Sequence, residues 1–284
     1  MQRPRSAPGN THGHARGHPG ETRTRHAAET WADASAMHAR VVGAVIMRDL
    51  QTRFGTGYFG FLLGLLIPLA HLTIAIVVTA ILGRPAAIGT DVPIFLMTGV
   101  LPFVVWLYGH RQIMQTLSQN RSLLYFPGVD LFDLFASRII LEIVTATLVV
   151  FIVLGTLAAI GHQPAVANWQ GFLLALIQAW LFGVGTGLIF GALGPLLPIA
   201  YLFGNILGPL LWGISGIFFL PDAIPERLAN ILMYNPLCQI IDTLRMSYYS
   251  EYYSSFFNQI LLNSMILGIV TLGMVIMAAA RKIV

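Results

Sequence analysis

Six long apolar stretches recur along the chain and limit its possible folds more than any other feature. A helix needs about 20 residues to cross a hydrocarbon layer of ~30 Å. The stretches lie at 58–82, 93–108, 136–160, 171–193, 199–220 and 259–280. Proline and glycine inside the second and fifth do not exclude them, because neighbouring helices can satisfy the freed backbone groups. The pattern predicts an all-α integral membrane protein with six transmembrane helices.

The composition agrees with a membrane protein and excludes one way of using ATP. Only 10% of the residues are charged, against about 25% in a soluble domain. Cys238 is the only cysteine, which excludes an intrachain disulfide. The only lysine, Lys282, precedes Ile283, so the chain cannot contain the P-loop motif G-x-x-x-x-G-K-[ST]. Any ATP-driven role therefore needs a second subunit, and we expect neither a catalytic, a cofactor-binding nor a metal site on this chain.

The N-terminal part differs in character from the rest. Residues 1–34 are rich in Arg, His, Pro and Gly without apolar periodicity, which predicts a disordered cytoplasmic tail. Over 37–54 apolar residues recur every four positions, with arginines on the opposite side, as in a helix lying in a membrane interface. We therefore expect residues 35–284 to form one transmembrane domain that begins with this helix.

The basic residues predict the orientation. Thirteen of the 16 Lys and Arg residues precede the first span, follow the second span or follow the last. Since positive residues stay inside, both termini are predicted to be cytoplasmic. The two halves show no internal repeat, which argues against a transporter built from inverted repeats.

Two segments are candidates for contact with a cytoplasmic partner. Arg48, Asp49 and Arg53 are concentrated at the start of the first span, where simple charge anchoring with an Asp49–Arg53 pair is the alternative. The 111–135 connection carries apolar and aromatic residues, among them Tyr125, Phe126 and Phe132. Such residues in an aqueous loop favour a docking surface. The alternative is that they lie on lipid headgroups or on the third span.

Polar and aromatic residues inside the spans are candidates for a substrate path. Arg138 and Glu142 stand one helical turn apart at the start of the third span, where a paired charge is tolerated. The candidate channel residues are Tyr58, Trp106, Tyr108, Trp180, Tyr201 and Trp212. Each could instead face lipid or pack between helices. His71, the ionisable residue at mid-depth, is interpreted as a packed polar residue rather than a proton relay.

The 221–257 segment contains apolar runs too short to span, which predicts short re-entrant or interfacial helices. Asp242 and Arg245 share one helical face and are candidates for an ion pair. Tyr248, Tyr249 and Tyr252 belong to a dense group of tyrosines. This group predicts either an ordinary aromatic belt or a stacking surface for sugar rings near an exit.

Several motifs, in this order, resemble the permease subunit of ABC-2 type transporters, in the branch that exports capsular polysaccharide. They are Arg48-Asp49-Leu50 with Gly60 and Pro68, Gly99-Val-Leu-Pro102, Phe126-Pro-Gly-Val with Asp133, Ala136-Ser-Arg-Ile-Ile-Leu-Glu142, Ile214-Ser-Gly-Ile-Phe-Phe with Pro225, and Asn235-Pro-Leu with Arg245. The resemblance covers residues 37–284. Phe103 departs from it, because a Trp is expected there, and Trp106 follows one turn later.

The resemblance implies a multi-pass protein of the bacterial inner membrane that forms a homodimer. Two copies of a separate P-loop ATPase, which binds the ATP and Mg, would contact the N-terminal helix and the first cytoplasmic loop. The cargo would be a lipid-linked capsular-type polysaccharide. O-antigen or teichoic-acid export and drug or lipid export are the alternatives on the same fold. Periplasmic and outer-membrane export proteins are further candidate partners besides membrane lipids, and no nucleic acid is expected.

Two other classes of protein fit the sequence less well. Gly213-Ile-Ser215-Gly216 matches the serine motif of intramembrane proteases, but that chemistry needs a histidine base, and no histidine follows His162. An ion-coupled transporter or channel would act without a partner. A proton- or ion-coupled mechanism would also place more carboxylates inside the spans.

Overall fold

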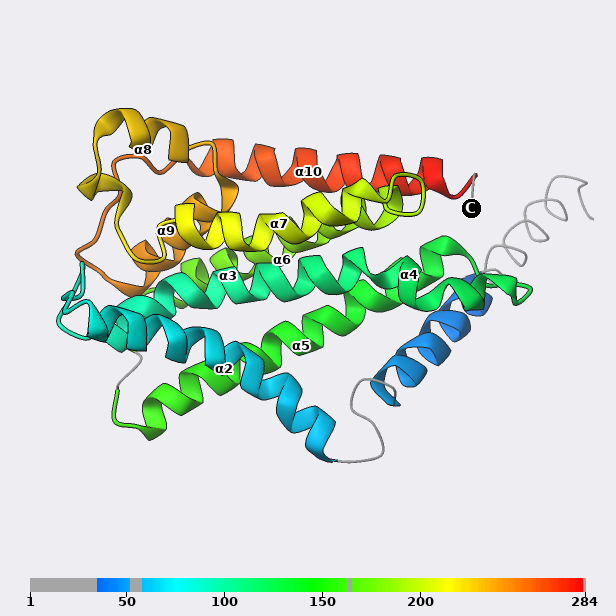
Figure 1. Cartoon of the computed structure of the whole chain (residues 1–284), viewed down its shortest axis with the longest axis horizontal. Helices are drawn as coiled ribbons and strands as arrows, with labels where there is room; N and C mark the ends of the chain where they lie inside the picture. The colour runs from blue at the N-terminus through cyan, green and yellow to red at the C-terminus, as the bar shows by residue number, and fades with distance from the viewer. Residues whose placement is uncertain (1–34, 52–57, 163–164, 283–284) are drawn as a thin grey trace, which may run out of the picture. The chain divides into compact units, whose positions relative to one another are not determined.

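A computed structural model describes residues 35–51, 58–162 and 165–282, without the side chains at 58–65 and 67–68, and every regular element in these ranges is helical (Figure 1). The predicted tail at 1–34 and Arg53 lie outside them. The described elements are a helix over 35–51, α2 (Tyr58–Ile81), α3 (Val92–Met114), α4 (Thr116–Asn120), the 3-10 helix η1 (Arg121–Tyr125), α5 (Leu131–Ala159), α6 (Trp169–Leu193), α7 (Ile199–Ile214), the 3-10 helix η2 (Pro221–Ala223), α8 (Glu226–Leu232), α9 (Pro236–Tyr248) and α10 (Gln259–Ala280). Residues up to Arg40 and residues from Val41 form two compact units, and the contacts below all lie within the second.

Four described helices, α3, α5, α6 and α10, are long and apolar enough to cross a membrane. The apolar part of α2 over Leu69–Ile81 and the whole of α7 are shorter apolar helices. The prediction of a helical membrane protein is therefore confirmed for the described residues. The count of six spans stays a prediction.

The connection before α5 is more regular than expected from the sequence. The second span was predicted to end at 108, but α3 continues to Met114, and α4 and η1 follow directly. The helix α5 begins at Leu131, five residues before the predicted span, because Asp130 and Asp133 form a capping box at its first turn. Much of the 111–135 connection is therefore ordered helix.

The fifth apolar stretch forms a shorter helix than predicted. The helix α7 ends at Ile214 rather than 220, and Gly216 adopts a positive φ of 79° just after it. Glycine takes this left-handed conformation without steric cost. Hydropathy alone cannot detect such a turn, since residues 217–220 remain apolar. The short helices α8 and α9 occupy the following segment, and their relation to the membrane stays a prediction.

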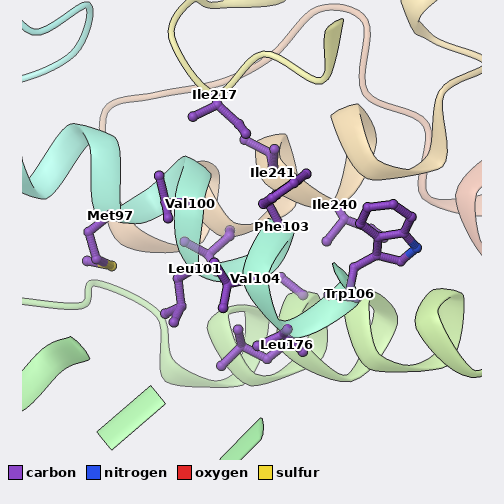
Figure 2. Close-up of a cluster of buried hydrophobic side chains, with 14 of the residues drawn as sticks. Met97, Val100, Leu101, Phe103, Val104, Trp106, Leu176, Ile217, Ile240 and Ile241 are labelled. Atoms are coloured by element: carbon purple, nitrogen blue, oxygen red, sulfur yellow. The ribbon is translucent and has the colours of Figure 1, made fainter. Parts of the chain in front are cut away.

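The core is built where α3 packs on α6, and α6 in turn packs on α9 and α10. Figure 2 shows side chains of α3 meeting Leu176 of α6 and Ile240 and Ile241 of α9. The backbones approach closely at Gly183, where an added Cβ would stand 2.9 Å from the Trp106 carbonyl oxygen. Small residues allow such close helix contacts inside a membrane. The α3–α6–α9 core thus fixes the positions of the side chains described next.

Candidate functional site

A buried ionic cluster lies near the start of α5. Arg138 Nη1 is 3.1 Å from Asp49 Oδ2, and Arg138 Nε is 3.8 Å from Glu142 Oε1, one helical turn further on. All three side chains are at most 6% exposed. Two carboxylates around a guanidinium reduce the large cost of burying a charge.

Polar groups of two further helices complete the cluster. Arg138 donates to the carbonyl and the side-chain oxygen of Gln112, and at 3.2 Å to Gln119 Oε1. Arg48 Nη2 donates to Asp49 Oδ1 at 2.9 Å and also to Asn120 Oδ1. The ionic cluster, meaning Arg48, Asp49, Arg138, Glu142, Gln112, Gln119 and Asn120, therefore joins the 35–51 helix to α3, α4 and α5. Sequence reasoning placed its charged members in two separate groups and missed the amides.

Three aromatic residues beside the ionic cluster are exposed. Tyr125 at the end of η1 is 83% exposed, Phe126 is 62% exposed, and Phe132 in the first turn of α5 is 56% exposed. We call these three residues the aromatic edge. Asp130, which lies among them in sequence, forms an ion pair with Arg281 at the end of α10. The aromatic edge thus leaves apolar surface uncovered by the part of the chain that the structure describes.

A second aromatic group, here called the aromatic cluster, joins α2, α3 and α7. His71 lies with its ring centroid 6.0 Å from that of Tyr108 and 5.8 Å from that of Trp212. Phe103 packs on Trp212 at 4.8 Å, and the Tyr108 hydroxyl is 3.4 Å from His71 Nδ1. His71, Tyr108 and Trp212 are only partly buried. Two predicted channel residues, Tyr108 and Trp212, are therefore brought together, with His71 and Phe103 between them.

The other predicted channel residues lie elsewhere. Trp106 is fully buried, and its ring stacks with His110 at 5.4 Å and Phe182 at 5.6 Å. Trp180 lines an apolar groove between α5 and α6. Tyr201 packs closely over Gly194. The side chain of Tyr58 lies outside the described ones, and a channel role for these residues stays a prediction.

The three predicted exit tyrosines line one pocket of about 480 Å³. We call it the tyrosine pocket, and its lining residues are Ile88, Gly89, Ala165, Ala167, Tyr248, Tyr249, Ser250, Glu251 and Tyr252. The loop before α6 is attached to α9 by Ala167 N–H, which donates to the Tyr248 carbonyl at 3.3 Å. Glu251 and the two loops could not be assigned from sequence, because they reach the tyrosines only through the fold.

Arg245 is completely buried in α9 and binds backbone rather than a carboxylate. It donates to the carbonyls of Gly216 at 2.7 Å, Ile217 at 2.9 Å and Phe219 at 3.0 Å, and its guanidinium lies 4.5 Å from the ring centre of Phe95. These bonds satisfy carbonyl groups in the turn after α7.

Asp242 binds other partners, so the predicted Asp242–Arg245 ion pair is wrong. Asp242 accepts from the Ser254 hydroxyl at 2.8 Å and from the Tyr252 hydroxyl at 3.2 Å. Burial raises the pKa of Asp242 to about 6, although both hydroxyl groups favour the ionised form. A shared helical face brought the two residues near each other but did not decide their partners.

Membrane-length helices with a buried ionic cluster at one junction and aromatic groups elsewhere define a multi-pass membrane protein. No family model matches the chain. It is 27% identical over 232 residues to the capsule polysaccharide export inner-membrane protein CtrC of Neisseria meningitidis serogroup B, which covers 80% of this chain and 85% of that protein. It is 26% identical over 213 residues to the polysialic acid transport protein KpsM of Escherichia coli, covering 75% of this chain and 83% of KpsM.

A more distant relative comes from another export system. The O-antigen export system permease protein RfbA of Klebsiella pneumoniae is 22% identical over 194 residues, 68% of this chain and 74% of that protein. The stronger similarities thus confirm the resemblance to capsular polysaccharide export permeases that the sequence motifs indicated.

Proposed function

We propose that the chain is the permease subunit of an ATP-driven exporter that moves a lipid-linked capsular-type polysaccharide across the inner membrane. The similarity to capsule-export inner-membrane proteins over most of the chain carries this proposal. ATP is hydrolysed by a separate subunit, since the only lysine cannot serve a P-loop.

The assembly we propose is a homodimer of six-span subunits with two ATPase copies. The distribution of basic residues supports cytoplasmic termini and, with them, a cytoplasmic position of α4 and the aromatic edge. In this orientation α8, α9 and the tyrosine pocket face outward, where periplasmic and outer-membrane export proteins are candidate partners.

The ATPase docks on the aromatic edge and transmits its motion through the ionic cluster. Large apolar side chains that stay exposed next to an ordered helix favour a protein contact. Arg138 and Arg48 bind groups of four helices at once. Movement of α4 is therefore passed to the 35–51 helix and to α5 together.

The glycan passes the aromatic cluster. A polar polymer needs hydrogen-bonding groups in a membrane path, while buried unpaired charge is costly there. The Tyr108 hydroxyl and the His71 ring supply such groups, and Trp212 and Phe103 supply flat apolar faces. Tyr108 and Trp212 are only partly buried, so part of each side chain remains accessible to a substrate.

Deletion of the gene tests the proposal. Surface capsular polysaccharide should disappear and accumulate inside the cell, and a plasmid copy of the wild-type chain should restore export. Normal surface polysaccharide in the deletion strain would refute the proposal. Loss of the lipopolysaccharide O chain with capsule unchanged would favour the O-antigen alternative suggested by the more distant relative. If the chain belonged to a drug or lipid exporter, deletion of its gene would leave both surface glycans unchanged.

A further inference from the structure

We propose that Arg111 binds an anionic group of the lipid-linked glycan, a carboxylate or a phosphate, at the cytoplasmic end of the aromatic cluster. This inference rests on the proposed function and deepens it, because it names a chemical group of the cargo and the side chain that recognises it. Arg111 lies in the last turn of α3, one turn after Tyr108 of the aromatic cluster. The two residues share a helix face, and Arg111 interacts electrostatically with the Tyr108 hydroxyl.

The Arg111 guanidinium lies between helices rather than beyond the end of α3. A Cβ added to Gly208, in the middle of α7, would stand 3.5 Å from Arg111 Nη2. Helical side chains lean toward the N-terminus of their helix, which for α3 is the outer end in the proposed orientation. Arg111 is only partly exposed. Its charge is therefore turned toward the aromatic cluster rather than toward the cytoplasm.

The Arg111 side chain has no ion pair or hydrogen bond with the part of the chain that the structure describes. The described acids on the predicted cytoplasmic side all have other partners, and they are Asp49, Asp130, Asp133 and Glu142. The helices α6, α7 and α10 contain no acidic residue. The charge of Arg111 is therefore not neutralised by any described carboxylate.

The other buried or partly buried arginines of the described ranges differ from Arg111 in this respect. Arg48 and Arg138 bind carboxylates and amides, and Arg245 binds three carbonyls. An unpaired cation away from water is costly, and in membrane proteins such a residue marks a ligand or ion path. The planar guanidinium matches the paired oxygens of a carboxylate or phosphate. An oxyanion is therefore the ligand whose charge and geometry fit Arg111.

The groups beyond Arg111 suit the sugar that carries such an anion. The Tyr108 hydroxyl and His71 Nδ1 lie 3.4 Å apart and are uncharged hydrogen-bonding groups of the aromatic cluster. Phe103 and Trp212 add flat faces with ring centroids 4.8 Å apart. An acidic group bound at Arg111 holds the attached sugar against this cluster. Arg111 thus recognises the charge of the cargo, and the aromatic cluster contacts its neutral parts.

Two matched trisaccharides test the inference on the full purified chain in nanodiscs of phosphatidylcholine. Each unit of trisialic acid carries a carboxylate, whereas chitotriose is uncharged. Equilibrium dialysis of the labelled sugars measures both affinities. Arg111→Gln should weaken trisialic acid binding about tenfold, because a hydrogen-bonded ion contact is lost, and should leave chitotriose binding unchanged. Arg111→Lys keeps the charge without the planar fork, so its affinity for trisialic acid should fall between the two.

A control variant separates this site from the general charge of the cytoplasmic side. Arg121→Gln removes an equal charge from an exposed position on η1. It should leave the affinities for both sugars unchanged. Arg111 in the last turn of α3 also favours the helix dipole and anchors the helix end. Anchoring alone involves no specific anion, so it predicts no difference between the two sugars.

A second arm distinguishes a sugar carboxylate from a lipid phosphate. Native mass spectrometry counts the phosphatidic acid that the chain retains from nanodiscs containing this lipid. Loss of retained phosphatidic acid in Arg111→Gln alone, with trisialic acid binding unchanged, would assign the site to the phosphate of the lipid part. Loss of trisialic acid binding alone would assign it to the glycan. Both results support an oxyanion site at Arg111.

Other results overturn the inference and leave the proposed function standing. If Arg111→Gln altered neither trisialic acid binding nor phosphatidic acid retention, Arg111 would only anchor α3. Equal losses for trisialic acid and chitotriose would show that the variant disturbs the fold rather than an anion contact. Surface glycan in the deletion strain is measured separately, so a failed anion assay and a failed export assay are distinguishable.

Discussion

Arg138 and Asp49 stand 89 positions apart in the sequence, and Arg138 Nη1 lies 3.1 Å from Asp49 Oδ2 with both side chains buried. This contact connects the N-terminal helix to the start of α5. Since Arg138 also binds groups of α3 and α4, one guanidinium joins most of the helices that face the proposed ATPase. The ionic cluster therefore links the positions of these helices to one another.

Removing Arg138 should destabilise the fold and uncouple transport. Arg138→Ala removes the guanidinium that pairs with the buried carboxylates of Asp49 and Glu142 and leaves Asp49 with Arg48, and breaking a buried pair costs about 3–5 kcal/mol. Thermal unfolding of the purified chain in detergent measures the loss. Arg121→Ala is the matched control, since Arg121 is exposed on η1. Equal stability of the two variants would contradict a structural role of the ionic cluster.

Charged substitutions on the aromatic edge should weaken the ATPase contact without unfolding the chain. Tyr125→Asp, Phe126→Asp or Phe132→Asp places a charge on an exposed apolar surface. Loss of a central contact costs about 2 kcal/mol or more, roughly 30-fold in affinity. Co-purification of the ATPase and its titration onto the permease measure the effect. Tyr234→Asp, which changes an equally exposed aromatic residue before α9, should leave ATPase binding intact. Unaltered ATPase binding in all three edge variants would exclude docking there.

Two tryptophans that the sequence predicted to line a channel should respond in opposite ways. Trp106 is fully buried between α3 and α6, so Trp106→Ala should lower the free energy of unfolding by about 3–5 kcal/mol. Trp212 is only partly buried in the aromatic cluster, so Trp212→Ala should keep most of the stability. We expect export to fall about tenfold in Trp212→Ala, which corresponds to about 1.4 kcal/mol of lost stabilisation. Thermal melts and a surface-glycan assay separate the two effects. Wild-type export in a stable Trp212→Ala protein would remove Trp212 from the path.

The close packing of α3 on α6 predicts a contrast between two glycines. A Cβ at Gly183 would stand 2.9 Å from a backbone oxygen of α3, and backbone cannot move aside cheaply. Gly183→Ala should therefore cost about 1–3 kcal/mol. Gly155 on α5 has open space around the same position, so Gly155→Ala should be neutral or stabilise by up to about 1 kcal/mol. Thermal melts of both variants test this prediction. Similar losses of stability in the two variants would show that the close contact with α3 does not determine the effect of the added Cβ.

Local features of the fold could be predicted from the sequence, whereas long-range partners could not. The helix α10 begins at Gln259 and ends at Ala280 as expected, because a long apolar run is bounded by the capping residue Asn258 and by Arg281. The end of α7 was missed, since a turn at Gly216 inside an apolar run leaves no hydropathy signal.

The candidate sites follow the same rule. The sequence predicted Asp49 as a partner-contact residue and Arg138 as half of a pair with Glu142. Only the fold shows that Asp49 and Arg138 contact each other. Tyr248, Tyr249 and Tyr252 were recognised as a group because they are close in sequence. Arg245 and Asp242 were wrongly paired, because a buried guanidinium can be satisfied by carbonyls of a turn as well as by a carboxylate.

Asp242 predicts a specific dependence of stability on pH. Its pKa is about 6 in the folded chain, against about 3.9 in an unfolded one. Because the folded state holds this proton more tightly, the contribution of Asp242 to stability is largest below about pH 4. It is lost as the pH rises through about 6, by roughly 2–3 kcal/mol. Asp242→Asn removes this titration, so its melting temperature relative to the wild type should rise between pH 4 and pH 6.5 and then stay level. A constant offset for Asp242→Asn at every pH would mean that Asp242 does not titrate in this range.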